Sequence, residues 1–233
     1  MARIHKSFFI LIILILSCSF CFSQISDTQK TLRIRLWAPL DENPASQIAP
    51  ETENSFGTSF RSLKATAPYL LSGMIYGWKF EYTPSDKTRN VEEYFDFIPI
   101  GEIPEDDEKI TFTNPAFLDT RVYCWLEYLR TDEMMISRQR WDSVQFPRVS
   151  GTGESSNLDS IDSIDGIKEA VKDAAKNAIR AYAQKQTKNK PKEVSGTILL
   201  KDVDPNIKIL KGKYTAHLDF FLYVDKITQY SQF

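Results

Sequence analysis

The clearest pattern of apolar and polar positions lies in the last third of the chain. Apolar residues recur there every three or four positions, namely Ile167, Val171, Ala174, Ala178 and Tyr182, which is typical of an amphipathic helix. Residues 195–203 then favour a strand. Residues 207–210 and 213–225 alternate between apolar and polar side chains. They predict a hairpin whose turn uses the positive φ that Gly212 tolerates.

The first half of the chain carries weaker signals of the same kind. Helical spacing predicts a helix over residues 59–72, with Pro68 as a kink or as the cap of a second short helix. Alternation predicts strands over residues 31–38, 74–82, 94–98, 109–113 and 121–130. Residues 134–141 fit either a continued strand or a helix. Residues 39–57 are rich in Pro, Asn, Ser, Thr and Glu and predict a surface loop.

A composition break at residues 150–165 separates the two halves. This segment is small, polar and free of aromatic residues, which is typical of a linker. We therefore predict an N-terminal half over 24–149, a linker over 150–165 and a C-terminal half over 166–233. The predicted fold class is α+β, with antiparallel sheets packed by amphipathic helices. Both halves show the order helix, strand, strand pair, which indicates either a duplication or a chance parallel, because that order is common in this class.

The Ala-rich helix from Ile167, followed by the hairpin up to Asp225, resembles small α+β domains of exported bacterial envelope and flagellum-associated proteins, of the LPP20 and flagellar T-ring type. The resemblance covers residues 167–225, with an echo over 59–130. It rests on the order of elements and not on a sequence motif. It implies a structural or assembly role and brings no catalytic residues to carry over.

The N-terminus predicts export from the cytoplasm. Arg3 and Lys6 precede the apolar run Phe8–Leu16, and small residues follow it before Gln24, which is the order of a secretory signal peptide over residues 1–23. The run is far shorter than the roughly 20 residues that span a bilayer as a helix. We therefore expect a periplasmic or extracellular protein.

A second processing route is also compatible with the N-terminus. Residues 15–18 form an imperfect lipoprotein box, with Leu16 where a small or β-branched residue is usual. Lipidation of Cys18 would anchor the same domain to a membrane face. A lipid anchor is the only membrane attachment that the sequence suggests.

Composition limits the classes of partner and chemistry. The 29 basic and 31 acidic residues give a net charge of −2, and loss of Arg3 and Lys6 with the signal peptide makes it about −4. We therefore expect no nucleic-acid partner. Cys124 is the only cysteine after ordinary cleavage, and a lone thiol is typically a small buried hydrophobe. The oligomeric state stays open.

The sequence contains no recognisable catalytic or metal-binding constellation. His217 is the only histidine after residue 23, and no Gly-x-Ser-x-Gly motif accompanies it or Asp219. The aspartates before Gly166 recur every third residue, which is the wrong spacing for an EF-hand. The acidic cluster Glu92, Glu93 and Asp96 favours a solvated turn. We therefore predict a non-enzyme without metal or cofactor, and an exported hydrolase ranks third.

Aromatic residues offer the remaining candidate sites. Tyr76, Trp78 and Tyr82 share one face of a predicted strand, and Tyr123 and Trp125 share a face of another. Such residues form core when buried and bind ligands or partners when exposed. Arg33, Arg35 and Trp37 form a mixed face on the first strand, and these residue types favour interfaces.

Two functional hypotheses follow. The first is an exported, non-enzymatic envelope protein that works through contacts with other envelope proteins, as a structural, assembly or accessory factor. The alternative is a module that binds a glycan or an apolar ligand with an aromatic strand face.

Overall fold

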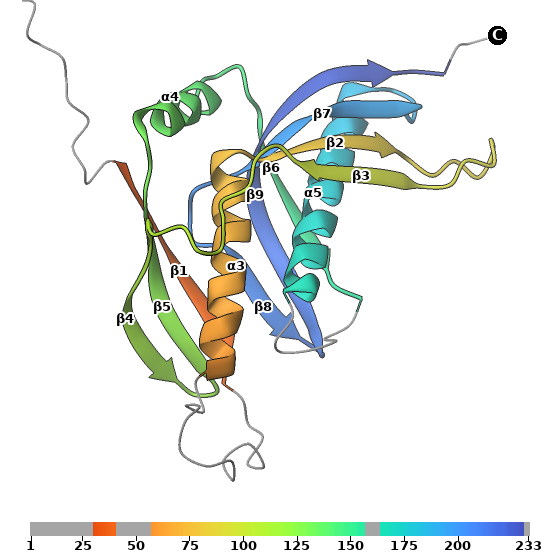
Figure 1. Ribbon diagram of the computed structural model, residues 1–233. Helices are drawn as coiled ribbons and strands as arrows, with labels where there is room; N and C mark the ends of the chain where they lie inside the picture. Colours follow the sequence, from red (N-terminus) through yellow and green to blue (C-terminus); the bar gives the residue numbers. More distant parts are fainter. Residues whose placement is uncertain (1–29, 41–56, 157–163, 231–233) are drawn as a thin grey trace, which may run out of the picture.

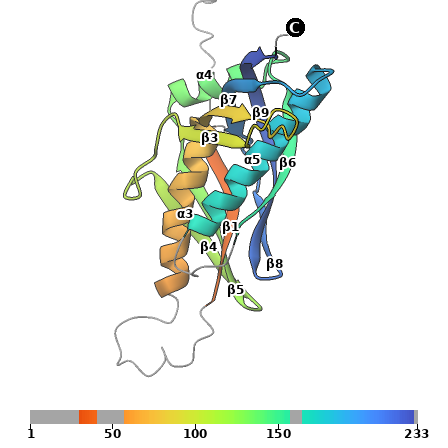
Figure 2. The same cartoon turned by 90° about the vertical axis from the view of Figure 1, so that its right-hand side faces the viewer.

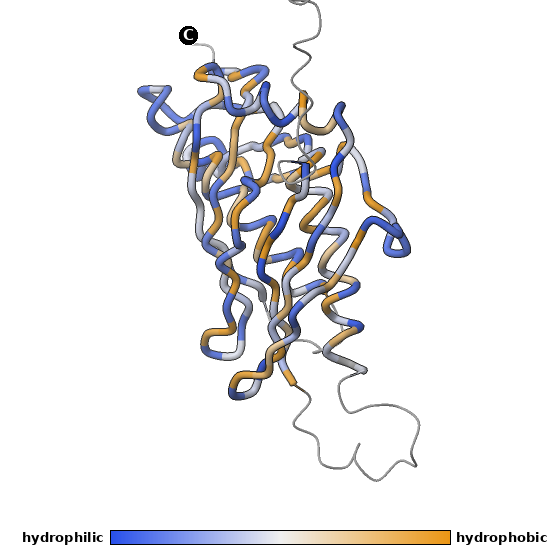
Figure 3. The backbone as a smooth tube through the Cα atoms, turned by 90° about the vertical axis from the view of Figure 1, so that its left-hand side faces the viewer, coloured by the Kyte–Doolittle hydropathy of each residue, from blue (hydrophilic) through white to orange (hydrophobic). Residues whose placement is uncertain are grey.

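The computed structural model describes residues 30–40, 57–156 and 164–230. Within these residues the chain forms two antiparallel sheets and three helices (Figure 1), which confirms the predicted α+β class. Apolar and polar residues alternate along the strands, as the sequence pattern requires (Figure 3). The predicted signal peptide, Cys18, residues 41–56 of the predicted loop and residues 157–163 of the predicted linker lie outside the described residues.

The smaller sheet has three strands in the order β1-β5-β4. Its members are β1 (Thr31–Pro39), β4 (Ile110–Leu118) and β5 (Arg121–Leu129). The larger sheet has the order β3-β2-β7-β9-β6, with β8 also paired to β9. Its members are β2 (Trp78–Thr83), β3 (Tyr94–Pro99), β6 (Arg148–Glu154), β7 (Glu193–Leu200), β8 (Asn206–Leu210) and β9 (Lys213–Thr228).

Strand β9 organises the larger sheet. Its residues 215–221 pair with β6, and its residues 213–217 and 220–228 pair with β8 and β7. Since both of these stretches overlap the β6 pairing, β8 and β7 follow each other along the opposite edge of β9. The predicted hairpin between β8 and β9 is confirmed, with positive φ at Lys211 and Gly212.

Three helices complete the fold: α3 (Gly57–Ile75), α4 (Asp132–Trp141) and α5 (Asp165–Gln186). Helices α3 and α5 lie on the same side of the two sheets (Figure 2). Helix α3 contacts both β1 and β7, so it straddles the line where the sheets meet. The apolar side chains of both helices and the inner sheet faces form one hydrophobic core.

The paired strands include no backbone ladder between β1 and β8. Hydrogen bonds that involve side chains join the two sheets instead. The Arg35 backbone N–H donates to Asp204 Oδ1 (2.8 Å), and Trp37 Nε1–H donates to the Ile207 carbonyl (2.9 Å). We call this junction the seam. It lets the two sheets act as one layer beneath α3 and α5.

Helix α5 packs unusually close to β6. A Cβ added at Gly151 would lie 2.0 Å from the Ala174 carbonyl oxygen, and one at Gly153 would lie 2.1 Å from the Ala174 nitrogen. The predicted alanine stripe of α5 does let a sheet approach closely. The prediction of a linker was wrong over residues 150–154, because the small polar residues there are the strand that receives this helix.

One further prediction needs correction, and one open alternative is resolved. Helix α3 runs through Pro68 to Ile75, so the expected strand over 74–82 begins only at Trp78, after Gly77 turns the chain at φ +72°. Residues 132–141 form a helix, so the segment 134–141 is helical and does not continue the strand. The Thr131 side chain caps the N-terminus of this helix by accepting a hydrogen bond from the Met134 N–H.

The predicted N-terminal and C-terminal halves share the larger sheet. Strand β2 of the first half pairs with β7 of the second, whereas β4 and β5 pair with β1 in the other sheet. The parallel between the halves is therefore limited to one helix each and to the hairpins β4–β5 and β8–β9.

The close approach of α5 gives a test of the packing. Gly151→Ala places a methyl group against main-chain atoms that cannot move alone, so we expect a loss of at least about 2 kcal/mol in the free energy of unfolding. Gly57→Ala is the matched control, because nothing lies within 4 Å of its Cβ position, and we expect a change within about 0.5 kcal/mol. Equal effects in denaturant titrations would contradict the described helix position.

Candidate functional site

A row of aromatic rings runs between α3, β2 and β3. Trp78 stacks on Phe97 with 4.8 Å between ring centres, and Tyr69 of α3 lies 5.8 Å from Trp78. Phe95 continues the row, 5.5 Å from Phe97 and 6.1 Å from Tyr82. The β2–β3 register places Tyr82 opposite Phe95, and this brings the rings onto one face.

A groove of about 650 Å³ opens beside this row, between α3, the start of α5, β2–β3 and the loop after β3. Its volume falls within the range of small-molecule sites. It is lined by Ala65, Pro68, Tyr69, Ser72, Trp78, Phe97, Pro99, Glu102, Ile103, Pro104, Glu105, Ile164, Lys168, Glu169 and Lys172. We call it the α3–α5 groove.

The structure places the three aromatics predicted on one strand in different surroundings. Trp78 and Tyr82 are 3% and 1% exposed, so their side chains are core and not an exposed row. Tyr76 lies in the turn before β2, with its ring against Gly101. The Tyr82 hydroxyl donates to Glu93 Oε1 (3.0 Å), and burial, followed by Glu93, raises the pKa of Tyr82 well above its usual range. Of the three residues Tyr76, Trp78 and Tyr82, only Trp78 lines the groove.

Tyr123 and Trp125 lie on the outer face of the smaller sheet, opposite the face that packs against α3. The Arg33 guanidinium lies 4.2 Å from the Trp125 ring centre, and that of Arg35 lies 4.5 Å from Tyr123. One step further along, Arg121 lies 4.2 Å from the Trp37 ring centre. The β1–β5 register creates these pairs, so it unites the two groups that the sequence suggests separately. We call these six residues the Arg–aromatic face.

One acidic residue on the outer face moderates its charge. Glu127 Oε1 lies 3.0 Å from Arg33 Nε and accepts from the Thr113 hydroxyl (3.2 Å). At the end of β4, Leu118 pairs with Arg121 and is 52% exposed. The face therefore combines three guanidinium groups, three aromatic rings and an apolar margin.

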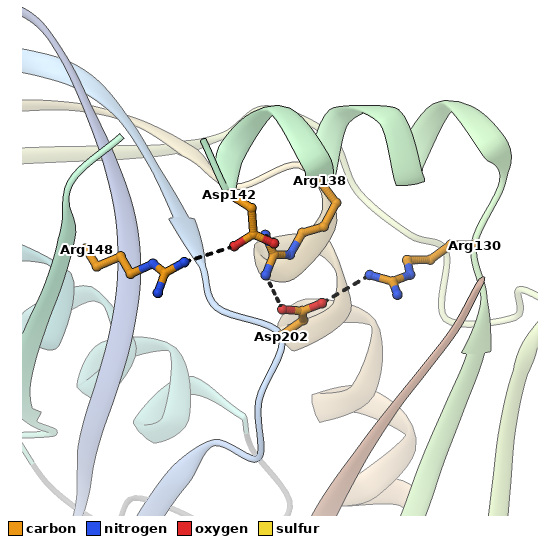
Figure 4. Close-up of polar contacts among 5 residues, drawn as sticks. All are labelled: Arg130, Arg138, Asp142, Arg148 and Asp202. Atoms are coloured by element: carbon orange, nitrogen blue, oxygen red, sulfur yellow. Dashed lines mark hydrogen bonds and ion pairs between the residues drawn. The ribbon is translucent and has the colours of Figure 1, made fainter. Parts of the chain in front are cut away.

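A cluster of charged residues ties α4 to both sheets (Figure 4). Asp202, just after β7, accepts from Arg130 (3.2 Å) at the end of β5 and from Arg138 (2.6 Å) of α4. Arg138 also pairs with Asp142 (2.8 Å), and Asp142 with Arg148 (3.4 Å). Sequence reasoning missed this cluster, since its members lie far apart in the chain. Its role is to hold the structure together.

Removal of the central carboxylate should therefore destabilise the fold. Asp202→Asn leaves Arg130 and Arg138, which are 9% and 12% exposed, without their shared counter-charge. We expect a loss of about 2–4 kcal/mol in the free energy of unfolding. Asp204→Asn, which removes only the charge at an exposed hydrogen bond to Arg35 N–H, should cost less than about 1 kcal/mol. Equal losses in urea unfolding would show that Asp202 is not central.

The remaining candidate residues do not assemble a catalytic arrangement. His217 Nδ1 lies 2.8 Å from the Thr152 hydroxyl, while Asp219 accepts from the Ser150 hydroxyl. His217 and Asp219 are thus each paired across to β6. Glu93 is engaged by Tyr82 and by Lys176 (3.3 Å). Among the described residues, no group of three or more His, Cys, Asp or Glu side chains is placed to hold a metal ion.

Cys124 is buried, as expected of a lone thiol, and burial raises the pKa of its thiol to about 11. At pH 8 this shift from 9.0 lowers the thiolate fraction about a hundredfold. In a chain beginning at Gln24, Cys124 should react with a thiol reagent at least about a hundredfold more slowly when folded than in urea. Fast reaction of the folded protein, followed by absorbance, would contradict this burial.

The comparisons with known proteins give a family and no activity. Residues 18–230 match a family of uncharacterised proteins. The chain belongs to this family. A relative described as an uncharacterized protein of Treponema pallidum (strain Nichols) is 28% identical over 201 residues, which cover 86% of this chain and 82% of the relative. No solved structure matches the chain. None of the helices in the described residues is both long and apolar enough to cross a bilayer.

Proposed function

We propose that this protein is an exported, non-enzymatic envelope protein that acts through contact with a partner protein, and that the Arg–aromatic face is its contact surface. The observation that carries the proposal is the set of three Arg–aromatic pairs on the outer face of the smaller sheet. The signal-peptide pattern over residues 1–23 supports a periplasmic or extracellular location. Lipidation of Cys18 is the alternative, and it would tether the same domain to a membrane face.

The residue types of this face suit a protein interface. Trp, Tyr and Arg dominate the energetic centres of interfaces, because they bury large areas and donate several hydrogen bonds. The guanidinium groups already lie over aromatic rings, so they lose less conformational freedom when a partner binds. The sheet also presents its strand β4 at an edge, where Leu118 extends the apolar area.

Charge favours a partner that presents carboxylates. Arg33, Arg35 and Arg121 outnumber Glu127 on this face, and the Glu127 carboxylate is already paired with Arg33. Arginine binds carboxylates through two parallel hydrogen bonds. Two copies of this chain would place like charges against each other in a symmetric pairing, so self-association is disfavoured. The proposed partner is therefore a different protein with an acidic surface.

Site-specific photo-cross-linking in the native host tests the proposal. A cross-linking residue at Leu118 should give a discrete adduct with a second protein. Tyr94, which is similarly exposed at 56% but lies on β3 at the far edge of the larger sheet, is the matched control and should give none. The double charge reversal Arg33→Glu, Arg35→Glu should reduce the Leu118 adduct at least about tenfold, because the partner's carboxylates are then repelled.

The comparison variant Lys79→Glu reverses an exposed charge on β2 and should leave the adduct intact. Both variants must keep the thermal unfolding transition of the original protein. An adduct of twice the chain mass would identify self-association and contradict the proposed partner. An adduct that survives the arginine reversal, or that forms equally from Tyr94, would exclude the Arg–aromatic face.

A further inference from the structure

We infer that the α3–α5 groove binds a single-chain amphiphile with an anionic head, such as a fatty acid, with its apolar chain on the aromatic row and its head at Lys168 and Lys172. The groove is lined by residues of α3 and α5, which lie on the same side of the two sheets (Figure 2), whereas the Arg–aromatic face lies on the other side of the smaller sheet. The inference therefore stands independently of the proposed protein contact.

The floor of the groove is built for apolar contact. Aromatic and aliphatic side chains from α3, β2, β3 and the following loop form most of its lining. The Ser72 hydroxyl is already engaged, since it donates to the Pro68 carbonyl (2.6 Å) and accepts from Ile103 N–H (2.8 Å). A sugar would need several free hydrogen-bonding groups in the floor, so the groove favours an acyl chain over a glycan.

The basic wall of the groove favours an anionic head. Lys168 and Lys172 lie one turn apart on α5, and neither forms an ion pair with any of the described residues. The next lysine along, Lys176, is held by Glu93 (3.3 Å) and Asp173 (3.0 Å). The Lys168 ammonium lies 5.9 Å from the Tyr69 ring centre, so it leans over the aromatic lining. Within the described residues, the two lysines thus lie at the groove without an ion-pair partner.

One further feature, on the α3 side of the groove, supports this orientation. The Tyr69 hydroxyl has no hydrogen-bond partner in the described part of the chain, and burial raises the pKa of Tyr69, so the hydroxyl remains a donor. Glu169 also lines the basic wall, but its carboxylate accepts from the Ser156 backbone and hydroxyl (both 2.9 Å).

The opposite rim of the groove sets the orientation of the bound amphiphile, and the groove volume limits the number of its acyl chains. Glu102 and Glu105 are exposed on the loop after β3, so an anionic head is disfavoured on that side. A groove of about 650 Å³ lies in the middle of the range for small ligands, which suits one acyl chain and not a two-chain phospholipid.

Calorimetric titration of the chain beginning at Gln24 tests the inference. Dodecanoate, below its critical micelle concentration, should bind with one molecule per chain. Dodecyltrimethylammonium, which has the same alkyl chain but a cationic head, should bind at least tenfold more weakly. Equal binding of the two surfactants would overturn the anionic assignment, and absence of dodecanoate binding would overturn the site.

Three variants locate the site. Lys168→Gln combined with Lys172→Gln should weaken dodecanoate at least tenfold, whereas Lys185→Gln, in the last turn of the same helix, should not change it. Ala65→Trp fills the groove from α3, where Ala65 is only partly buried, and should abolish binding while the unfolding transition is kept. Unchanged affinity in the lysine pair or in Ala65→Trp would overturn the inference.

A vesicle arm separates the two sources of an anionic lipid head. The protein should either not sediment with phosphatidylglycerol vesicles, or be released from them when free dodecanoate is added as a competitor. Sedimentation that is strong and insensitive to dodecanoate would show a membrane surface to be the ligand, and would overturn the inference of a single-chain amphiphile.

Discussion

The contact between α5 and β6 is the constraint on which the rest of the arrangement depends. Ala174 of the helix lies against Gly151 and Gly153 of the strand, so main chain meets main chain with no side chain between them. This close packing fixes the height of α5 above the sheet. It thereby sets how far Lys168 and Lys172 stand from the aromatic row, and how deeply Tyr82 is covered. A single methyl group on the strand would displace all of these.

The two sheets are held together by means other than backbone pairing. Helix α3 covers the junction from the inside, the seam joins β1 to β8, and Asp202 joins the end of β5 to α4. Hydrophobic burial is not directional, so it alone would allow one sheet to slide on the other. The seam and the Asp202 cluster supply directional contacts, which specify one position of the smaller sheet.

The sequence predicts those parts of the fold whose pattern is local. Helix α5 and the β8–β9 hairpin follow from long runs of one period. Strand β6 is missed because Gly151 and Gly153 serve a distant helix, and without that helix their composition indicates a linker. The same limit applies to α3, since Met74 and Ile75 are apolar and fit a helix and a strand equally until Gly77 fixes the turn.

The candidate sites divide in the same way. Alternation along each strand predicts that Arg33, Arg35 and Trp37 share one face, and that Tyr123 and Trp125 share another. That these two groups lie against each other requires the β1–β5 register. Burial of Trp78 depends on α3 and that of Tyr82 on α5, and the local pattern places neither helix on these residues. The α3–α5 groove and the Asp202 cluster combine residues from four or more segments, and no short stretch of sequence contains such information.

Trp37 belongs to two structures at once. Its ring receives Arg121 on the Arg–aromatic face, while its indole N–H is one of the two contacts of the seam. A molecule that draws Trp37 outward would loosen the joint between the sheets, and a loosened joint would in turn lower the affinity of that molecule, because linkage between two equilibria is reciprocal. Through the Trp37 indole, binding at the outer face of the smaller sheet is thermodynamically coupled to the alignment of the two sheets.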